Sequence, residues 1–496
     1  MKKISGFISI ALLVTVIAKA LGMAREMAQA RMFGASPEMD AFSLASSSTV
    51  VLFTTLAYAL CIAAIPILSG LSEEESFRAS DNLLLITLSG SAVLTVIFTI
   101  LNAKGVLPTL AGGTVLYKNL ASYLIPLLPL ITVIYMLLSL LQARGHYAIQ
   151  GALSLPYNLV IIIYILLADE MKITRFVIVV VLAWFTQLAV LIPGLLKERY
   201  FPRLRPDFRA PYLKNYFKTV FSTILTTSVF YWLFLTDILF VSQMGPGSAS
   251  VFYYADKLFT PIATTLLYSI SAVIFPRFGK VASEAPQTTT AAGSSPDRAY
   301  AAYVLNLLDG TLRLILPISA LLFAFAPDIA RVLFADGSFT NHDALISGRI
   351  LSLYALGLGG FFVLDIVSKA WYALKRIRYP SMVVLAVLLI NFLSDILVTR
   401  LFPDAWAFPA LTSTLCLTGG GIVLMYALLR NSGQNVKPLY LSAAVSVALG
   451  AVLYVIRSLV DFNRLSKPVV IPVCISLGTA GFGIYWLITQ LLRRKT

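Results

Sequence analysis

The sequence has little charge for its length. Only 12% of its 496 residues are Asp, Glu, Lys or Arg, whereas 58% are hydrophobic. A soluble domain usually carries about 25% charged residues, so this chain lacks the polar surface that a water-facing domain needs. These figures exclude a soluble globular protein and indicate a polytopic membrane protein.

Histidine and cysteine are also scarce. The three cysteines, Cys61, Cys416 and Cys474, lie in apolar segments without paired or metal-like spacing, so we predict no disulfide framework and no zinc site. The two histidines, His146 and His342, lie in short loops and are interpreted as solvated residues. A membrane glycosyltransferase or acyltransferase needs a base or nucleophile in a sizeable loop. We therefore predict that the protein is not an enzyme and has no cofactor.

Long apolar runs dominate the rest of the sequence. A membrane helix needs about 20 predominantly apolar residues, and about fourteen segments meet this length, centred near residues 14, 55, 92, 130, 158, 185, 230, 263, 314, 360, 389, 418, 447 and 480. Pro or Gly interrupts several of them, as at Pro126, Pro317 and residues 357–360. The predicted fold class is an all-α polytopic membrane protein with about 14 transmembrane helices.

The basic residues are concentrated in alternate connections between these segments. The formal net charge is +15, but no nucleic-acid motif accompanies it, so nucleic acid is not an expected partner. By the positive-inside rule, the loops that are rich in Lys and Arg face the cytoplasm. The sequence thus predicts a multi-pass protein of the plasma membrane with both termini in the cytoplasm.

A basic stretch at residues 197–218 is the clearest linker. It separates an N-lobe of six spans (1–196) from a C-lobe of six spans (219–430), and the last two spans occupy 431–496. Two six-helix halves with a substrate site between them are a common transporter plan. We predict this plan here.

Some ionisable residues fall at membrane depth, where a charge is costly and often functional. Lys19 and Arg25 are six residues apart, about 240° around a helix, so one helix cannot bury both against a single partner. With Glu26 and with Lys257 on the eighth span, they are candidates for a cationic cavity that binds a phosphate or pyrophosphate. The alternative is interfacial anchoring and helix pairing.

Two further pairs have a structural interpretation. Asp309 with Arg313, and Asp365 with Lys369, are acidic and basic residues at i and i+4. Such pairs neutralise each other along one helix face. We predict intrahelical ion pairs at both places.

A second candidate site consists of oxygen ligands. Asn391 and Asp395 are i, i+4 on the eleventh span and share a face, and Asp237 lies on the seventh span. Two carboxylates and an amide are hard ligands that suit Na⁺, and Thr412 on the twelfth span is a candidate for a further oxygen. The alternative is a hydrogen-bonded pair of acids between helices.

Several motifs resemble the MurJ (MviN) lipid II flippase family of the multidrug/oligosaccharidyl-lipid/polysaccharide exporter superfamily. They lie in the family's order and spacing at residues 19–26, 33–42, 252–258, 275–277, 333–339 and 369–375. The resemblance implies a V-shaped, two-lobed flippase that moves an undecaprenyl-pyrophosphate-linked peptidoglycan precursor from the inner to the outer leaflet by alternating access. It implies that Lys19, Arg25 and Lys257 bind the pyrophosphate, with Glu26 and Asp40 as their acidic companions.

The resemblance also places the sodium site of the family at Asp237, Asn391 and Asp395, with Na⁺ as a candidate coupling ion beside the membrane potential. It implies a lipid-tail groove in the last two spans. The expected partners are the lipid-linked oligosaccharide, membrane lipids and the cell-wall synthesis machinery.

One departure from the family lies in the second span. Phe53, within the run at residues 51–58, stands where the family has an Arg. This departure favours an alternative cargo, another polyprenyl-linked oligosaccharide for exopolysaccharide, capsule or teichoic-type polymers, whereas the other motifs favour lipid II.

Overall fold

Helices make up the regular structure of the part of the chain that the structure describes. The computed structural model describes residues 2–110, 114–168, 170–203, 206–227, 229–284, 298–430, 432–460, 462 and 465–493, and no strand occurs among them. The first helices are α1 (Lys2–Phe33), α2 (Pro37–Ser46), the π-helix η1 (Ser47–Val51), α3 (Leu52–Ser69), α4 (Glu73–Ala103), α5 (Val106–Leu110), α6 (Val115–Leu124), α7 (Leu127–Ala143), α8 (Ala148–Ala152), α9 (Ser154–Leu167) and α10 (Ile173–Lys197). They are followed by α11 (Leu213–Thr227), α12 (Val229–Val241), α13 (Ser248–Glu284), α14 (Arg298–Phe334), α15 (Asn341–Leu356), α16 (Leu358–Ala373), α17 (Arg378–Leu401), α18 (Phe408–Leu429), α19 (Lys437–Leu459) and α20 (Lys467–Arg493).

The helices agree with the predicted fold class. Eleven stretches among the described residues are long and apolar enough to cross a membrane, and α12 is a shorter apolar helix. The three predicted segments outside those eleven stretches fall in α1, α12 and α13. The prediction of an all-α polytopic membrane protein is therefore confirmed.

The predicted interruptions have two outcomes. Pro126 separates α6 from α7, and Gly357 separates α15 from α16, so the helix is interrupted at both positions. Pro317, in contrast, lies inside the continuous helix α14. Residues 276–301 are rich in Ala, Ser, Thr and Pro, a composition that predicts a flexible cytoplasmic loop. Residues 285–297 lie outside the described residues, and the two ends of this stretch belong to α13 and α14.

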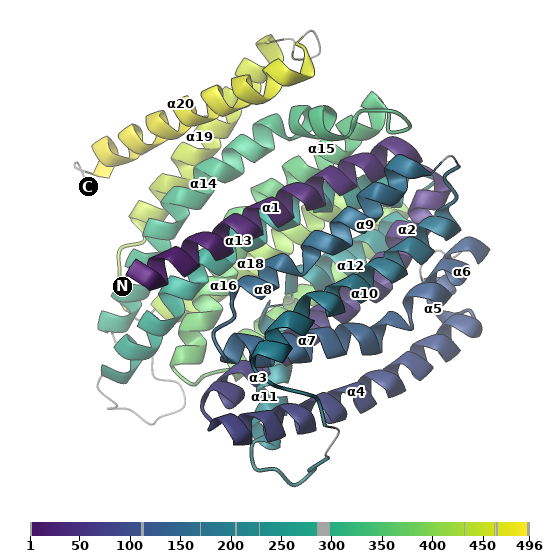
Figure 1. Cartoon of the computed structure of the whole chain (residues 1–496). Coiled ribbons are helices and arrows are strands. Elements are labelled where there is room, and N and C mark those ends of the chain that lie inside the picture. Colours follow the sequence, from purple (N-terminus) through teal and green to yellow (C-terminus); the bar gives the residue numbers. More distant parts are fainter. Residues whose placement is uncertain are drawn as a thin grey trace. The chain divides into compact units, whose positions relative to one another are not determined.

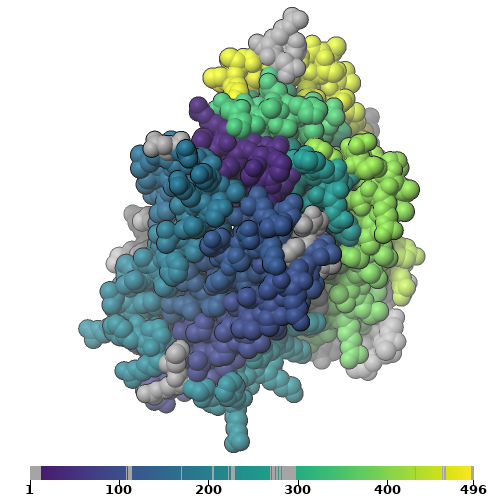
Figure 2. Space-filling view, turned by 90° about the vertical axis from the view of Figure 1, so that its right-hand side faces the viewer, coloured from purple at the N-terminus to yellow at the C-terminus, as the bar shows by residue number. Residues whose placement is uncertain are grey.

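The chain forms two compact units, residues 1–250 with 337–339, and residues 251–336 with 340–496. In the first unit α3 packs against α4, α7 and α11, and α1 packs against α8 and α9. On α4 the side chains of Val93, Val96 and Ile100 are exposed, and Figure 2 shows one face of this unit in blue. An exposed apolar helix face of this kind suits contact with lipid acyl chains.

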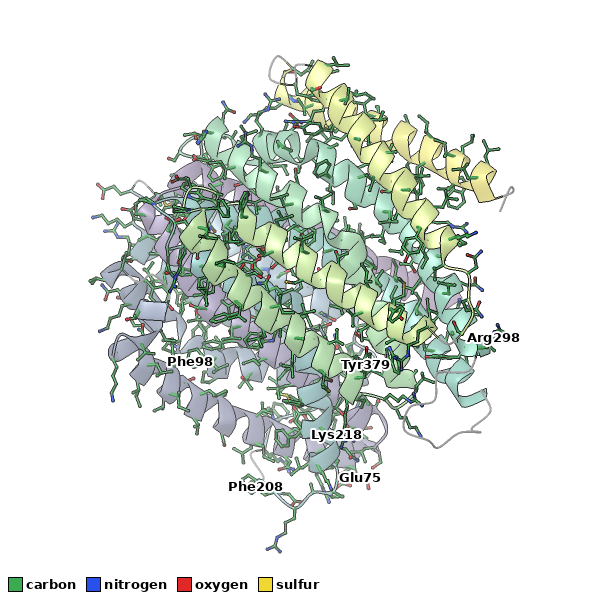
Figure 3. The ribbon with its side chains drawn as sticks, turned by 180° about the vertical axis from the view of Figure 1, so that it is seen from behind. Glu75, Phe98, Phe208, Lys218, Arg298 and Tyr379 are labelled. Atoms are coloured by element: carbon green, nitrogen blue, oxygen red, sulfur yellow. The ribbon has the colours of Figure 1, made fainter. Side chains whose placement is uncertain are left out.

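The basic linker is fixed to the start of α4. The Asp81 carboxylate accepts hydrogen bonds from the Tyr200 hydroxyl (2.7 Å) and the Arg203 backbone N–H (2.9 Å). The Asn82 side chain donates to the Asp207 carbonyl and the Tyr212 hydroxyl. Figure 3 shows Glu75 of α4 and Phe208 of the linker at the same end of the first unit. The described parts of the linker, before residue 204 and after residue 205, are therefore both held against this end.

In the second unit α14 is the central element. It packs against α15, α16, α19 and α20, and α19 and α20 lie side by side (Figure 1). Phe325, Leu453 and Tyr485 belong to a buried apolar cluster that joins α14, α19 and α20. This cluster connects the last two helices to the rest of the second unit.

Candidate functional site

The charged group on α1 lies in the first unit. Arg25 forms an ion pair with Glu26, and its guanidinium lies over the ring of Tyr157 at 5.2 Å from the centroid. Glu26 is 3% exposed, and its second oxygen, Oε2, has no hydrogen-bond partner among the described residues. Lys19 lies six residues earlier on the same helix and is exposed. Of the two predicted cations on α1, Arg25 is therefore half-buried and Lys19 is exposed.

Tyr157 of α9 was not predicted as part of this group. Its ring contacts Trp184 of α10 at 5.7 Å between centroids, so two other helices fix its position under Arg25. A guanidinium over an aromatic face gains a cation–π attraction of about 0.5–2 kcal/mol. The sequence offers no spacing rule that connects residues 25 and 157.

Asp40 lies on α2 and has a different environment from the α1 group. Its carboxylate accepts hydrogen bonds from the backbone N–H groups of Gly247 (2.5 Å) and Ser250 (2.7 Å) and from the Ser250 hydroxyl (2.5 Å). These donors come from the turn before α13 and from its first turn. In this structure Asp40 stabilises a helix N-terminus, which is a favourable position for a carboxylate.

Lys257 lies in the second unit, on α13. Its ammonium lies 3.5 Å from the Asp256 carboxylate and 4.3 Å from the ring centroid of Tyr253. Asp256 also accepts a hydrogen bond from the Thr260 hydroxyl. The side chain of Lys257 is 21% exposed, so this cation remains accessible.

The two predicted intrahelical ion pairs are present. Arg313 and Asp309 are 2.6 Å apart on α14, and Lys369 and Asp365 are 2.5 Å apart on α16. The structural interpretation of these four residues is confirmed.

The predicted oxygen ligands on α17 and α18 lie together in the second unit. Asp395 accepts hydrogen bonds from the Asn391 amide (2.9 Å) and the Thr412 hydroxyl (2.6 Å). Asn391 and Asp395 are fully buried. Ser413 was not predicted, although it follows Thr412 directly; its hydroxyl donates to the Asn391 oxygen at 3.1 Å.

Asp237 is fully buried on α12 in the first unit. Among the described residues, no group of three or more His, Cys, Asp or Glu side chains could hold a metal ion. The α17–α18 cluster nevertheless has a donor set of the right chemistry for Na⁺, because its carboxylate, amide and hydroxyl oxygens are hard ligands.

An apolar groove runs between α14 and α20. It has a volume of about 620 Å³, and its lining includes Leu321, Phe325, Val470, Ile475 and Phe482. Its walls are almost entirely hydrocarbon, which suits an acyl or prenyl chain.

Phe53, the residue at the divergent position of the second span, packs in the core of the first unit. It is fully buried on α3, and its ring meets that of Phe98 edge to face at 5.2 Å. The same region contains the π-helix η1, one turn before it. Phe53 therefore contributes packing and carries no charge for a ligand.

The fold and these sites are those of a membrane transporter, because ionisable and hydrogen-bonding groups lie on long apolar helices, as at the substrate and ion sites of transporters. The family model "Lipid II flippase MurJ" matches residues 29–467. The chain therefore belongs to the MurJ family of lipid II flippases, which are transporters.

Known relatives agree with this assignment. A probable lipid II flippase MurJ of Buchnera aphidicola subsp. Acyrthosiphon pisum is 26% identical over 410 residues, covering 77% of this chain and 76% of the relative. A solved structure of a lipid II flippase MurJ in an inward closed conformation has a TM-score of 0.76 at 21% identity and covers 96% of this chain and 98% of its own. An inward-facing MATE family transporter of the MOP superfamily has a TM-score of 0.63 at 14% identity, covering 86% and 99%. These two structures share the fold of this chain.

Proposed function

We propose that this protein moves lipid II, the undecaprenyl-pyrophosphate-linked peptidoglycan precursor, from the inner to the outer leaflet of the bacterial plasma membrane. The observation that carries the proposal is the family match over residues 29–467. The family match favours lipid II over the alternative cargo, another polyprenyl-linked oligosaccharide. Transport proceeds by alternating access, with the headgroup passing through the protein and the lipid tail remaining in the bilayer.

The cations assigned to the pyrophosphate are Lys19, Arg25 and Lys257. Arg25 and Lys257 each pair with an acidic neighbour, Glu26 and Asp256, and each lies over a tyrosine ring. A pyrophosphate competes with those carboxylates and offers several oxygens to the Arg25 fork. Release of the substrate restores these two ion pairs, so Arg25 and Lys257 each have a carboxylate partner in both states.

The coupling ion proposed here is Na⁺, bound by Asp395, Asn391 and Thr412 with Asp237 as a further ligand. The α17–α18 cluster supports this assignment because its oxygens are buried and already mutually oriented. The apolar groove between α14 and α20 is assigned to the prenyl tail of the substrate. The distribution of Lys and Arg along the sequence supports a cytoplasmic position of both termini.

The test is a rescue assay in bacterial cells depleted of their own lipid II flippase. An externally added toxin that cleaves lipid II reports its exposure at the outer surface. We expect the wild-type chain to restore cleavage and Arg25→Ala to fail. Arg78→Ala is the matched control, because Arg78 also pairs with an acidic residue, Glu74, but is 69% exposed on α4.

Two outcomes would contradict the proposal. Normal membrane insertion without cleavage, in a host that a known flippase rescues, would make another lipid-linked glycan the cargo. Cleavage restored equally by Arg25→Ala would leave lipid II transport in place and remove Arg25 from the binding site.

A further inference from the structure

A second pocket in the second unit has no part in the function proposed above. It has a volume of about 820 Å³ and is lined by residues of α14, α15, α19 and the connection between α17 and α18. A volume of this size lies within the range of about 300–1,000 Å³ that ligand sites occupy. The pocket is distinct from the α14–α20 groove, since the two have no lining residue in common.

The lining includes two arginines. Arg457 of α19 donates from its Nε to Asp328 of α14 at 2.5 Å, and Asp328 is buried. The hydrogen bond to Asp328 holds the Arg457 guanidinium in place and uses only one of the guanidinium nitrogens. Asp328 does not line the pocket.

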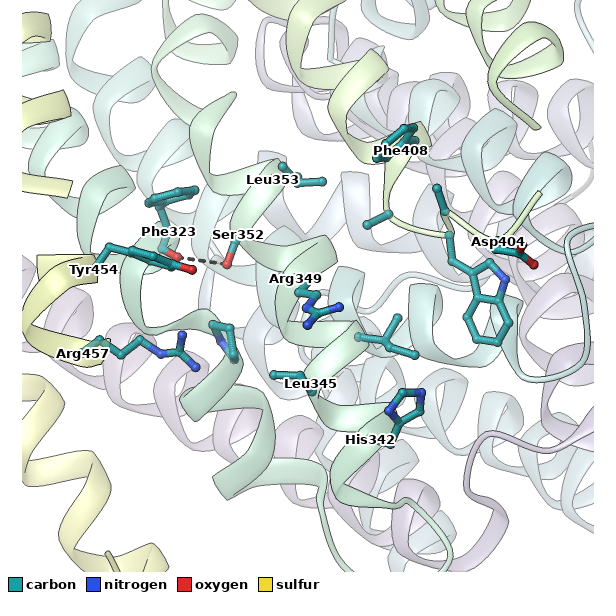
Figure 4. A pocket seen from close by; sticks show the side chains of 15 residues that line it. Phe323, His342, Leu345, Arg349, Ser352, Leu353, Asp404, Phe408, Tyr454 and Arg457 are labelled. Atoms are coloured by element: carbon teal, nitrogen blue, oxygen red, sulfur yellow. Dashed lines mark hydrogen bonds between the residues drawn. The ribbon is translucent and has the colours of Figure 1, made fainter. Parts of the chain in front are cut away.

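Arg349 of α15 is the second arginine. Its side chain is exposed and forms no ion pair or hydrogen bond with any described residue. Figure 4 shows its guanidinium in the middle of the lining residues, with Arg457 on one side and His342 on the other. An arginine of this kind can offer its planar fork to a phosphate.

The remaining walls are apolar and aromatic. The ring centroids of Phe323 and Tyr454 lie 6.1 Å apart on one side of the pocket, and Phe408 lies on the other side (Figure 4). Trp406 also belongs to the lining. Tyr454 and Phe408 are 51% and 37% exposed. Aromatic side chains that are partly exposed at a helix end are typical of the depth at which lipid headgroups lie.

The position of the pocket along the helices agrees with that depth. Arg457 lies near the end of α19, His342 at the start of α15, and Asp404 between α17 and α18. Ser352 and Leu353 lie farther along α15. The pocket therefore reaches from a loop-bearing end of the unit toward its apolar middle.

We propose that this pocket binds a bilayer glycerophospholipid, with its phosphate between Arg349 and Arg457 and its acyl chains on the exposed apolar rim. Basic pockets between transmembrane helices are known sites for lipid headgroups. A soluble phosphate would gain nothing from the aromatic and aliphatic walls, whereas a lipid uses both parts of the lining. Asp404 also lines the pocket and lies apart from the two arginines (Figure 4). Its negative charge repels an anionic headgroup, which is thereby directed toward Arg349 and Arg457.

The experiment measures lipid binding to the purified full-length protein by native mass spectrometry. Phosphatidylglycerol and diacylglycerol with the same acyl chains differ by the phosphoglycerol headgroup, which carries the negative charge. We expect wild-type protein to retain phosphatidylglycerol and to bind diacylglycerol at least about tenfold more weakly, the factor that a charge-assisted hydrogen bond supplies.

The principal variant is Arg349→Gln, which removes a charge without breaking an ion pair. We expect it to weaken phosphatidylglycerol binding by about tenfold and to leave diacylglycerol binding unchanged. Arg349→Lys keeps the charge but loses the fork, so it should restore part of the affinity. Arg400→Gln is the matched control, because Arg400 is also exposed, near the end of α17, and does not line the pocket.

Three results would overturn the proposal. Equal binding of the two lipids would show that the phosphate is not recognised, and unchanged binding by Arg349→Gln would place the lipid elsewhere. Displacement of phosphatidylglycerol by millimolar inorganic phosphate, or by equimolar undecaprenyl pyrophosphate, would assign the pocket to a soluble anion or to the carrier lipid of the substrate. Each result is independent of the rescue assay, since it measures binding and not transport.

Discussion

Asp40 caps the first turn of α13 through Ser250, whose backbone N–H and hydroxyl both donate to the same carboxylate oxygen, at 2.7 and 2.5 Å. The other oxygen accepts from the N–H of Gly247. A helix begins with backbone N–H groups that have no partner within the helix, and the negative charge also opposes the positive end of the helix dipole. A side chain from α2 thus completes a helix that starts about 200 residues later in the chain, as the separation of Asp40 and Ser250 shows.

Asp40→Asn should therefore destabilise the protein. The side-chain amide of Asn keeps one oxygen acceptor but has no negative charge. Its NH₂ group would face a backbone N–H, and two donors cannot form a hydrogen bond with each other. We expect a loss of about 1.5–3 kcal/mol, the range for hydrogen bonds to charged groups, seen as a lower thermal midpoint of the purified protein. Glu38→Gln is the control, since Glu38 is exposed on the same helix. Equal midpoints for the two variants would contradict the capping role.

Two glycines hold a close contact in the first unit between the end of α1 and residues 337–339. Gly34 and Gly337 both have a positive φ, +59° and +58°. A Cβ at Gly337 would lie 2.4 Å from the Arg31 carbonyl oxygen, and one at Gly34 would lie 2.3 Å from the Ser338 carbonyl oxygen. The Ser338 N–H donates to the Arg31 carbonyl at 2.8 Å, so the two segments are joined by their backbones.

Gly337→Ala should lower the thermal midpoint of the purified protein. The left-handed backbone conformation alone costs a residue with a Cβ about 1–2 kcal/mol, and the steric overlap of the new Cβ with the Arg31 carbonyl oxygen adds to this cost. Gly90→Ala is the matched control. Gly90 lies within α4, and a Cβ there would meet nothing within 4 Å. Alanine is the better helix former by about 1 kcal/mol, so this control should be neutral or stabilising. A neutral Gly337→Ala would show that the segment rearranges.

The positions of the membrane-spanning helices were predictable because the length of an apolar run determines whether it can cross a bilayer. Every predicted span centre falls inside a helix, since a bilayer imposes the same length on each span and forbids unpaired backbone groups. The breaks were less predictable. Pro126 and Pro317 are the same residue type, yet only Pro126 separates two helices, because neighbouring helices decide whether a distorted turn is tolerated.

The site was predictable mainly where its residues share a helix. Thr412 of α18 is an exception: it was predicted beside Asp395 of α17, and its hydroxyl donates to the Asp395 carboxylate. Asp309 with Arg313, and Asn391 with Asp395, follow from the i, i+4 spacing. Tyr157 beneath Arg25 and the backbone donors around Asp40 were not predictable, because tertiary packing of different helices brings them together. No periodicity within one segment contains that information.

Thr412→Val should weaken the stabilisation of the purified protein by Na⁺, if the α17–α18 cluster binds the ion as proposed. Valine keeps the shape of threonine but removes the hydroxyl that donates to the Asp395 carboxylate. Thr399→Val is the matched control, because the Thr399 hydroxyl donates to the backbone carbonyl of the same Asp395. We expect Na⁺ to raise the thermal midpoint of the wild type and of Thr399→Val, and to raise that of Thr412→Val less, because a ligand that binds the native state stabilises it. Choline chloride at the same ionic strength separates sodium binding from salt effects. Equal sodium responses in all three proteins would remove Thr412 from the ion site.

Tyr200→Phe should remove a pH-dependent contribution of the basic linker to stability. Burial, together with the hydrogen bond to the Asp81 carboxylate, raises the pKa of the Tyr200 phenol above its ordinary value. An acid with a raised pKa in the folded state contributes its full stability below the unfolded pKa, about 10 for tyrosine, and loses it as the pH rises toward the folded value.

The wild type should therefore exceed Tyr200→Phe in thermal midpoint by a constant amount at pH 8 and 9, and this difference should shrink above pH 10. Tyr147→Phe is the control, because Tyr147 is 67% exposed before α8 and should match the wild type throughout. A difference between wild type and Tyr200→Phe that stays constant to pH 11 would show that folding does not raise the pKa of the Tyr200 phenol, and would contradict the prediction.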